Sequence, residues 1–269
     1  MTSSALTPRQ QSWTIIQITD THLMDQEDLD FVSINPEQTF KAVIQDIMEQ
    51  YPEADAIIHT GDLAQVPVVS TYERYINFME TLNVPFYQIP GNHDNAECFP
   101  FYDHKDEIHT IQLGKWSICL MNSAVKGKVD GWVEQAQLEQ LNQILQDNQD
   151  QSIVLACHHH PFEMKSRWID NHKLKNTEQL TDILGQHNNI KAVLFGHVHQ
   201  DSLHKWNGIP FLSTPSTCVQ FKPLSEKFAL DEQAPGYRVM HLHENGRFET
   251  QVHRISGLIQ KINGEISGY

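Results

Sequence analysis

The sequence has few cysteines and little positive charge. Its four cysteines are widely spaced with no Cys-x-x-Cys pair, and Cys119 and Cys157 lie within apolar runs. This usage is typical of free buried thiols and argues against a disulfide framework or a zinc knuckle. Only 19 lysines and arginines stand against 34 acidic residues, which gives a formal net charge of -15. The surface as a whole therefore repels nucleic acid and anionic membranes, and we expect neither as a partner.

Long apolar runs are also missing. No segment approaches the ~18 consecutive apolar residues of a membrane helix, and Met1 to Ser12 is polar, without the apolar core of a signal peptide. We therefore expect a cytoplasmic protein. The 269 residues contain no internal repeat, linker or low-complexity tract. We expect one domain over residues 1–269, with residues 1–12 as a flexible N-terminal extension.

Apolar spacing in the first half of the chain predicts alternating strands and helices. A strand over 15–18 precedes a helix that starts after Asn35 as its N-cap and runs through 40–48, and a strand at 57–58 follows. Ser70 and Glu73 form a capping box that predicts a second helix, before a strand at 86–89. This order favours parallel strands joined by right-handed crossovers, with functional loops at their carboxyl ends.

The second half predicts further strands and helices. Strands are expected over 116–122, 153–156 and 191–195, and helices over 134–146 and 177–184, the last capped by Asn176 with Gln179. Short strands over 209–212, 237–242 and 248–252 suggest an antiparallel remainder. About ten strands are too many for one small open sheet. The pattern therefore favours an α/β fold in which two sheets pack together with helices outside.

Five apolar runs end in residue types that bind metals. The motifs are Asp20-Thr21-His22, Gly61-Asp62, Gly91-Asn92-His93-Asp94, His158-His159-His160-Pro161 and Gly196-His197-Val198-His199. Read alone, an aspartate after a strand more often starts a loop or caps a helix. Imidazole combined with carboxylate and amide oxygens suits Fe, Mn, Zn or Co, and the lack of thiolate argues against a soft-metal site. Bound metal would also supply local positive charge for an anionic substrate in this acidic protein.

In this order, the five motifs resemble the D-x-H, G-D, G-N-H-D, H-H-P and G-H-x-H signature of the calcineurin-like metallophosphoesterases. The resemblance implies a four-layer αββα sandwich of two mixed β-sheets flanked by helices, with a dimetal centre at one edge. It also implies two divalent ions, Fe²⁺ or Mn²⁺ first and Zn²⁺ or Co²⁺ as other options. The implied ligands are Asp20, His22, Asp62 and His199 for the first ion, and Asp62, Asn92, His158 and His197 for the second, with Asp62 bridging.

In this family the histidine of G-N-H-D points toward the phosphate and helps the leaving oxygen depart. The resemblance therefore makes His93 catalytic, together with Asp62. Many members steady this histidine with a second aspartate in G-D-x-x-D, but that position is Gln65 here. An amide can orient an imidazole by a hydrogen bond, yet it cannot raise the pKa of the ring as a carboxylate would.

Longer stretches resemble, more narrowly, the bacterial class III cyclic nucleotide phosphodiesterases. They are Ile15 to Leu23, Gly61 to Gln65, Trp168 to Asn176, Ser213 to Pro223, Ala234 to Gly236, Val252 to Arg254 and Gly268-Tyr269. The implied reaction is hydrolysis of 3′,5′-cyclic AMP to 5′-AMP by in-line attack of a metal-bridging hydroxide. The implied substrate contacts are His22, Asp62, Asn92, His93, His158 and His199. The chain is expected to be a monomer or a homodimer.

Two other functions stay open from the sequence. One is a metallophosphoesterase acting on a glycerophosphodiester, a phospholipid headgroup or a nucleotide, and the other is a non-enzymatic scaffold of the same fold. The intact set of ligand types argues against the scaffold.

Several further residues have structural interpretations. One of His159 and His160 should face the core or brace its loop, because side chains alternate in direction along extended backbone. Asp94 should cap a helix or orient a ligand. Trp168 and Phe221 could stack on a base but are more typical of core packing. The isolated histidines at 104, 109, 172, 187, 204 and 253 are expected at the surface or in structural hydrogen bonds.

Overall fold

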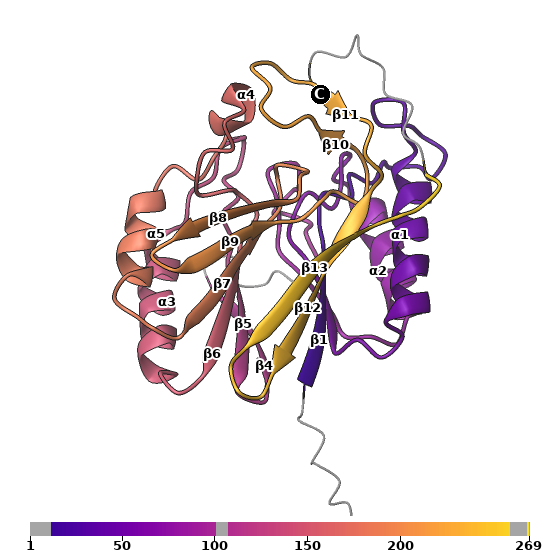
Figure 1. Cartoon of the computed structure of the whole chain (residues 1–269). Coiled ribbons are helices and arrows are strands. Elements are labelled where there is room, and N and C mark those ends of the chain that lie inside the picture. The colour runs from indigo at the N-terminus through magenta and orange to yellow at the C-terminus, as the bar shows by residue number, and fades with distance from the viewer. Residues whose placement is uncertain (1–11, 101–106, 259–267, 269) are drawn as a thin grey trace, which may run out of the picture.

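The computed structural model describes residues 12–100, 107–258 and 268. Its helices are α1 (Pro36–Gln50), α2 (Val69–Glu80), α3 (Gln135–Asp147), α4 (Arg167–Asp170) and α5 (Thr177–Leu184). Its strands are β1 (Ser12–Ile18), β2 (Ala56–His59), β3 (Phe86–Gln88), β4 (His109–Leu113), β5 (Trp116–Leu120), β6 (Ser152–Ala156), β7 (Ile190–Phe195), β8 (Ser202–Trp206), β9 (Ile209–Ser213), β10 (Gln220–Phe221), β11 (Leu230–Asp231), β12 (Gly236–His243) and β13 (Phe248–Arg254). Figure 1 shows these elements along the chain.

The strands form two large mixed sheets and one small one. The first large sheet has the order β13-β12-β1-β2-β3, and the second has the order β4-β5-β6-β7-β9-β8. Neighbours from β1 to β3 are parallel, whereas β12 pairs antiparallel with both β1 and β13. In the second sheet β5, β6, β7 and β9 are parallel, with β4 and β8 antiparallel at the edges. Strands β10 and β11 form a separate antiparallel pair.

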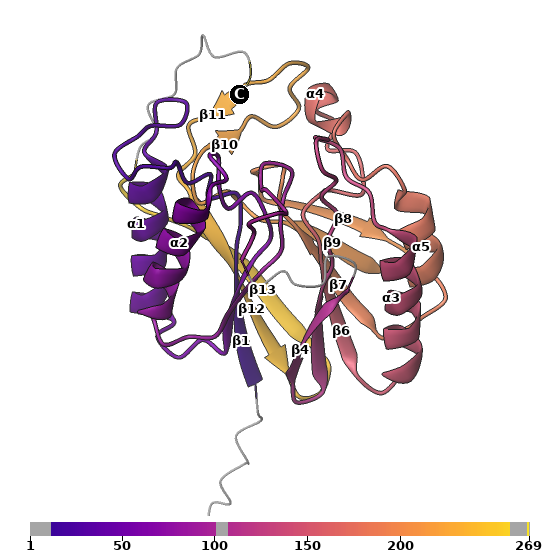
Figure 2. The ribbon, with the colours of Figure 1, turned by 180° about the vertical axis from the view of Figure 1, so that it is seen from behind.

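Side-chain alternation along the strands produces four layers. In β1, Ile16 and Ile18 pack in the core beneath α1 and α2, whereas Ile15 packs in the core between the two sheets. In β6, Leu155 likewise faces α3 and α5, whereas Val154 faces the other sheet. Figures 1 and 2 show α1 and α2 on one side of the sheets and α3 and α5 on the other. The αββα sandwich is therefore confirmed, and the strands read as continuous apolar runs because both faces are buried.

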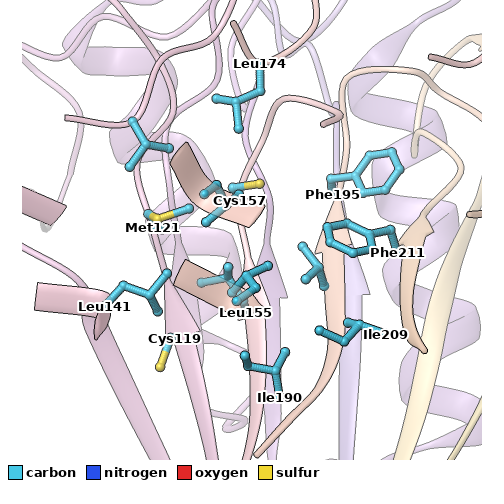
Figure 3. Packing of buried hydrophobic residues seen from close by; sticks show 14 of the residues in the cluster. Cys119, Met121, Leu141, Leu155, Cys157, Leu174, Ile190, Phe195, Ile209 and Phe211 are labelled. Carbon is cyan, nitrogen blue, oxygen red and sulfur yellow. The ribbon is translucent and has the colours of Figure 1, made fainter. Parts of the chain in front are cut away.

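The core beneath α3 and α5 contains two of the four cysteines. Figure 3 shows Cys119 and Cys157 among Leu141, Leu155 and Phe211. Cys218 is also buried, Cys98 is half-buried, and none of the four, all of which lie in the described ranges, forms a disulfide. The prediction of free thiols is confirmed, with Cys98 less buried than expected.

Some local predictions were wrong. The predicted capping box at Ser70 and Glu73 does not start α2, because the helix begins at Val69 and Val68 is its N-cap without a side-chain bond. The Thr71 hydroxyl closes this turn by donating to the Val66 carbonyl at 2.9 Å. The antiparallel remainder was only partly right, because β9 pairs parallel with β7. The short or edge elements β4, β8, β10, β11 and α4 were not predicted.

Other local predictions were confirmed. Asn35 caps α1, since its side-chain oxygen accepts the Gln38 backbone N–H at 2.9 Å. Asn176 precedes α5 as predicted, but its oxygen accepts the Val133 N–H at 3.0 Å rather than an N–H of its own helix. Within the described ranges, no helix combines the length and apolar character needed to cross a membrane. The predicted extension over residues 1–12 lies outside those ranges except for Ser12, which starts β1.

Candidate metal centre

The ligand-type residues lie in turns that follow β1, β2, β3, β6 and β7. Five of them have left-handed backbones, with φ of 54° at Asp20, 52° at His22, 53° at Asp62, 66° at His197 and 48° at His199. Non-glycine residues in this region cost on the order of 1–3 kcal/mol each and persist only where their surroundings hold them. Strain therefore concentrates at the positions that carry the candidate ligands.

Two glycines allow these turns to approach one another. A Cβ at Gly61 would lie 2.4 Å from His158 Nδ1, and a Cβ at Gly91 would lie 2.2 Å from Asp62 Oδ1. Because a side chain at either position would collide with the candidate ligands, both must be glycine.

One group of candidate ligands joins β1 to β7. His199 Nε2 lies 3.2 Å from Asp20 Oδ1 and 3.2 Å from His22 Nε2. All three side chains are buried. The Asp20 carboxylate is fixed by the Thr19 hydroxyl at 2.6 Å and by the His197 backbone N–H at 3.0 Å. These three residues offer ligand atoms close enough together to hold one metal ion.

A second group joins β2, β3 and β6. His158 Nε2 lies 3.2 Å from Asn92 Oδ1 and 3.4 Å from Asp62 Oδ2. Asp62 Oδ2 also lies 3.9 Å from His22 Nε2 in the first group, and it has no hydrogen-bond partner. The other oxygen, Oδ1, accepts the His93 backbone N–H at 2.8 Å. One carboxylate oxygen of Asp62 is therefore directed between the two groups.

Three imidazoles are fixed by acceptors at their outer nitrogen. His22 Nδ1 lies 2.8 Å from Gln65 Oε1, His158 Nδ1 lies 2.8 Å from the Thr60 carbonyl, and His199 Nδ1 lies 2.8 Å from the Val219 carbonyl. Because these oxygens only accept, each Nδ1 must carry a hydrogen, which leaves Nε2, facing the centre, as the nitrogen that can bind a metal. This arrangement is typical of metal-binding histidines.

His197 is held differently. It lies close enough to His158 and His159 for a ligand nitrogen of each to share a metal, but neither of its ring nitrogens has a hydrogen-bond partner, although the residue is buried. Both His159 nitrogens are already engaged, by the Ser123 hydroxyl at 2.9 Å and the Val129 carbonyl at 3.1 Å. Of these three histidines, His158 and His197 retain a nitrogen for a metal.

The electrostatics of the metal-free centre favour a cation. Burial alone would raise the pKa of the Asp62 carboxyl, but His158 and His93 hold it well below its usual range. Burial lowers the pKa of His22 to about 3 and that of His197 well below its usual value. Burial opposes the charged form of His158 as well, but the Asp62 carboxylate raises its pKa to about 9. The centre thus combines the ionised Asp62 carboxylate and the neutral imidazoles of His22 and His197 with a protonated His158 beside Asp62.

The donor set therefore fits a metal cluster. Lone pairs of Asp62 Oδ2, Asn92 Oδ1 and the imidazole Nε2 atoms point at one another, and lone pairs at such short range repel unless a cation or proton lies between them. The unpartnered Asp62 oxygen and the unpartnered His197 nitrogens are the atoms that such cations would satisfy.

Comparison with known proteins identifies the family. The model of the calcineurin-like phosphoesterase family matches residues 14–201, which includes every candidate ligand. The chain belongs to the calcineurin-like phosphoesterase family.

Relatives within the calcineurin-like phosphoesterases span nearly the whole chain. The 3′,5′-cyclic adenosine monophosphate phosphodiesterase CpdA of Haemophilus influenzae is 36% identical over 90% of this chain and 89% of its own. CpdA of Escherichia coli K12 is 36% identical over 90% of each chain, and that of Pseudomonas aeruginosa is 30% identical over 95% of this chain and 94% of its own.

Solved structures show the same fold at low identity. A purple acid phosphatase from yellow lupin seeds superposes with a TM-score of 0.69 at 14% identity, over 94% of this chain and 53% of its own. A dimetal phosphatase from Danio rerio superposes with a TM-score of 0.62 at 12% identity, over 91% of this chain and 99% of its own. At these identities the likeness concerns the fold alone.

The fold brings together all the residues of the predicted phosphoesterase centre. Asp20, His22, Asp62, His158, His197 and His199 are buried, whereas Asn92 and His93 are half-buried. The His93 ring lies edge-on to His22, with a centroid distance of 5.0 Å. The side of the centre near Asn92 and His93 is therefore the more accessible one.

Gln65 contacts a candidate ligand. Its side-chain oxygen accepts a hydrogen bond from His22 Nδ1 at 2.8 Å. Asp94 behaves as expected, because its carboxylate accepts the N–H groups of Gly91, Leu63 and Ala64 at 2.9–3.1 Å and so braces two ligand turns.

Sequence reasoning gave no role to His59. Its ring lies below the centre, with Nε2 2.5 Å from the Thr21 hydroxyl and Nδ1 accepting the Gly61 N–H at 3.3 Å. His59 thereby joins the turn of Asp20 and His22 to the turn of Asp62. Its place in the β2 run is visible in the sequence, but an isolated histidine gives no signal for this role.

The structure also places the remaining histidines and the two aromatic residues that the sequence analysis considered. Both His159 and His160 are buried, so neither is a surface residue, and His159 braces the loop at Val129. Phe221 is buried and stacks on His199, which confirms the packing interpretation, and Trp168 packs against it. His109 and His204 are exposed, His187 bonds Asn142 and His253 bonds Tyr51, whereas His104 lies outside the described residues.

Metal binding should tighten as the pH rises toward 9. In the metal-free protein His158 is protonated below a pH of about 9 and must release that proton to bind metal, whereas Asp62, His22 and His197 are already unprotonated near neutrality. Release of one proton makes the apparent association constant rise about tenfold per pH unit. Titration of metal-free protein with Mn²⁺ at about pH 7 and about pH 8, against a chelating dye, measures this slope.

A variant with His253→Gln serves as the control for this titration. Its ring bonds the Tyr51 hydroxyl at 3.1 Å and belongs to none of the candidate ligand groups, so the slope should stay the same. Equal affinities at the two pH values in the unmodified protein would contradict the protonation of His158.

Proposed function

We infer that this protein is a metal-dependent phosphodiesterase that hydrolyses 3′,5′-cyclic AMP to 5′-AMP. The observation that carries the proposal is the Asp62 carboxylate, with one oxygen directed between two clusters of buried imidazole and carboxylate groups. The substrate is supported by several relatives named as 3′,5′-cyclic AMP phosphodiesterases, which are 30–36% identical over at least 90% of this chain.

We assign the ligands of two divalent ions. Asp20, His22, Asp62 and His199 would hold the first, and Asp62, Asn92, His158 and His197 the second. Their distances and tautomers support this assignment, and the mixture of imidazole, carboxylate and amide oxygen favours Fe²⁺ or Mn²⁺, with Zn²⁺ and Co²⁺ compatible. When bound, such ions supply Lewis acidity that polarises phosphoryl oxygens and activates water at neutral pH.

The residues of the chain prepare the site for an anionic diester. Gln65 and the Thr60 and Val219 carbonyls hold three ligand imidazoles so that their Nε2 atoms point inward. We propose that His22, Asp62, Asn92, His93, His158 and His199 surround the phosphate of the nucleotide. Because Asn92 and His93 are the least buried of the candidate residues, the phosphate would enter from their side.

His93 is proposed to assist departure of the 3′ oxygen. Its backbone N–H is fixed on Asp62 Oδ1 at 2.8 Å, which places its ring at the accessible side of the centre. From there it would hold a proton for the leaving oxygen or stabilise the charge that develops on it, a contribution of about 10²–10⁴ in rate.

The direct test is hydrolysis of 3′,5′-cyclic AMP by the purified full chain, loaded separately with Mn²⁺ and Fe²⁺, with 5′-AMP as the product. Cyclic GMP, a glycerophosphodiester and a nucleoside monophosphate serve as comparison substrates. Turnover of the comparison substrates without turnover of cyclic AMP would favour another metallophosphoesterase activity. A protein that binds metal and hydrolyses none of them would fit a scaffold, and either result would overturn the proposal.

Asp62→Ala should remove metal from both positions. The residue supplies the shared oxygen, so its loss leaves each ion one ligand short. Elemental analysis of the purified variant should find far less than one equivalent where the unmodified protein holds two. Asp182→Asn, on the exposed face of α5, is the matched control and should retain both. Two equivalents in the Asp62 variant would exclude its bridging role.

His93→Ala should keep both metals yet slow turnover by about 10²-fold or more. The ring is proposed to act on the leaving oxygen and is not assigned as a ligand, so elemental analysis and a cyclic AMP assay should separate the two properties. His109→Ala, an exposed histidine on β4, controls for loss of an imidazole. An unchanged rate would remove His93 from the mechanism.

A further inference from the structure

The short helix α4 is linked, through one intervening residue in each case, to both histidines of the Gly196-His197-Val198-His199 motif. Helix α4, β10 and β11 lie at the same end of the molecule (Figures 1 and 2). The Ser225 backbone N–H, in the connection between β10 and β11, donates to the Ser166 hydroxyl at 3.1 Å, directly before α4. Helix α4 is thereby tied to the segment that carries Phe221.

One contact path runs from Trp168 to His199. The Phe221 ring stacks on His199 with a centroid distance of 3.8 Å and an interplanar angle of 11°. Trp168 packs edge-on against Phe221 at 5.0 Å and 77°. Phe221 is buried and also contacts Phe228, so the packing of Trp168 restricts the position of the ring that covers His199. The face of one candidate ligand is thus covered through a residue of α4.

A second path runs from Asp170 to His197. The Asp170 carboxylate lies 3.7 Å from His160 Nε2 and is itself fixed by the Met164 backbone N–H at 2.7 Å. The His160 ring stacks on His197 with a centroid distance of 5.4 Å and an interplanar angle of 25°. His160 is fully buried and neither of its ring nitrogens has a hydrogen-bond partner at normal distance. Asp170 is therefore the polar group that faces this imidazole.

The backbone alone does not fix the orientation of the His197 and His199 rings. Both have left-handed φ values, of 66° and 48°, which persist only when surrounding groups impose them. His199 has a carbonyl partner for its second nitrogen, but His197 has none. The orientation of His197 must therefore come from the rings that pack around it, His158, His159 and His160.

We propose that Trp168 and Asp170 are positioning residues for the metal centre, each acting on a different histidine. Trp168 orients His199 through Phe221, and Asp170 orients His197 through His160. This inference rests on the proposed function, because the two histidines are assigned there to different ions. One four-residue helix would thus set the geometry of both metal positions without contacting either metal.

The test measures metal affinity rather than activity. Metal-free Trp168→Leu and Asp170→Ala variants are titrated with Mn²⁺ against a chelating dye, alone and combined with His197→Ala or His199→Ala. Each should weaken one of the two binding steps about tenfold or more, the usual effect of removing a group that orients a metal ligand. Trp168→Phe and Asp170→Asn, which keep an aromatic edge and an acceptor oxygen, should restore most of the affinity.

The crossed design separates positioning from general destabilisation. Trp168→Leu should weaken metal binding in the His197→Ala background and have no further effect in the His199→Ala background, and Asp170→Ala should show the reverse. Arg167→Gln, on an exposed position of the same helix, is the control and should change neither step. Far-UV circular dichroism is used to check that each variant is folded, and Trp168→Met or Asp170→Ser replaces any variant that is not.

Two results would overturn the inference. One is equal weakening in both backgrounds or by Arg167→Gln, which would indicate loss of stability only. The other is unchanged affinity in both variants while the unmodified protein binds two ions and hydrolyses cyclic AMP, which would leave the proposed function intact. If the unmodified protein binds no metal, the proposed function itself fails.

Discussion

The structure depends on a set of buried polar atoms that face one another. Asp62 Oδ2, Asn92 Oδ1 and the Nε2 atoms of His22, His158 and His199 approach within 3.2–3.9 Å. Without a cation the oxygens and the unprotonated nitrogens repel one another, and a buried carboxylate oxygen without a partner costs free energy. The three imidazole rings cannot turn away from one another, because their Nδ1–H groups are bonded to acceptors on the outer side. The same atoms that destabilise the metal-free protein are those that a divalent ion would coordinate.

The four-layer architecture explains how distant segments reach one point. Parallel strands place their carboxyl ends at one edge of a sheet, and two such sheets packed face to face bring two edges together. Thus β1 and β2 present Asp20 and Asp62 from one sheet, and β6 and β7 present His158 and His197 from the other. Direct bonds join the two edges, including that from His158 Nδ1 to the Thr60 carbonyl. Rearranging either sheet would therefore misplace ligands of both groups.

The sequence predicted those parts of the site whose side chains stand at the end of an apolar run. Asp20, Asp62 and His158 carry this signal, because several such runs occur together in the order of the family motifs, although each run alone is common at the start of a loop. It could not reveal the Thr60 and Val219 carbonyls as hydrogen-bond acceptors, since every residue has a backbone carbonyl whatever its side chain. Helix α4 was not predicted because four residues are too few to show helical periodicity. Strand β8 was not predicted because most of its side chains are exposed. Ser70 misled the prediction because a capping pattern permits a helix start but does not require one.

The pairing of β1 with β12 has a consequence for how the protein is made. A nascent chain that has emerged through His199 already contains every proposed ligand, but β1 has only β2 beside it. Its other neighbour, β12, begins at Gly236, and Ser12 pairs with His243, near the end of the described chain. Such a contact between distant segments forms late and slowly. The strand that precedes Asp20 therefore gains its second neighbour only after β12 has been translated.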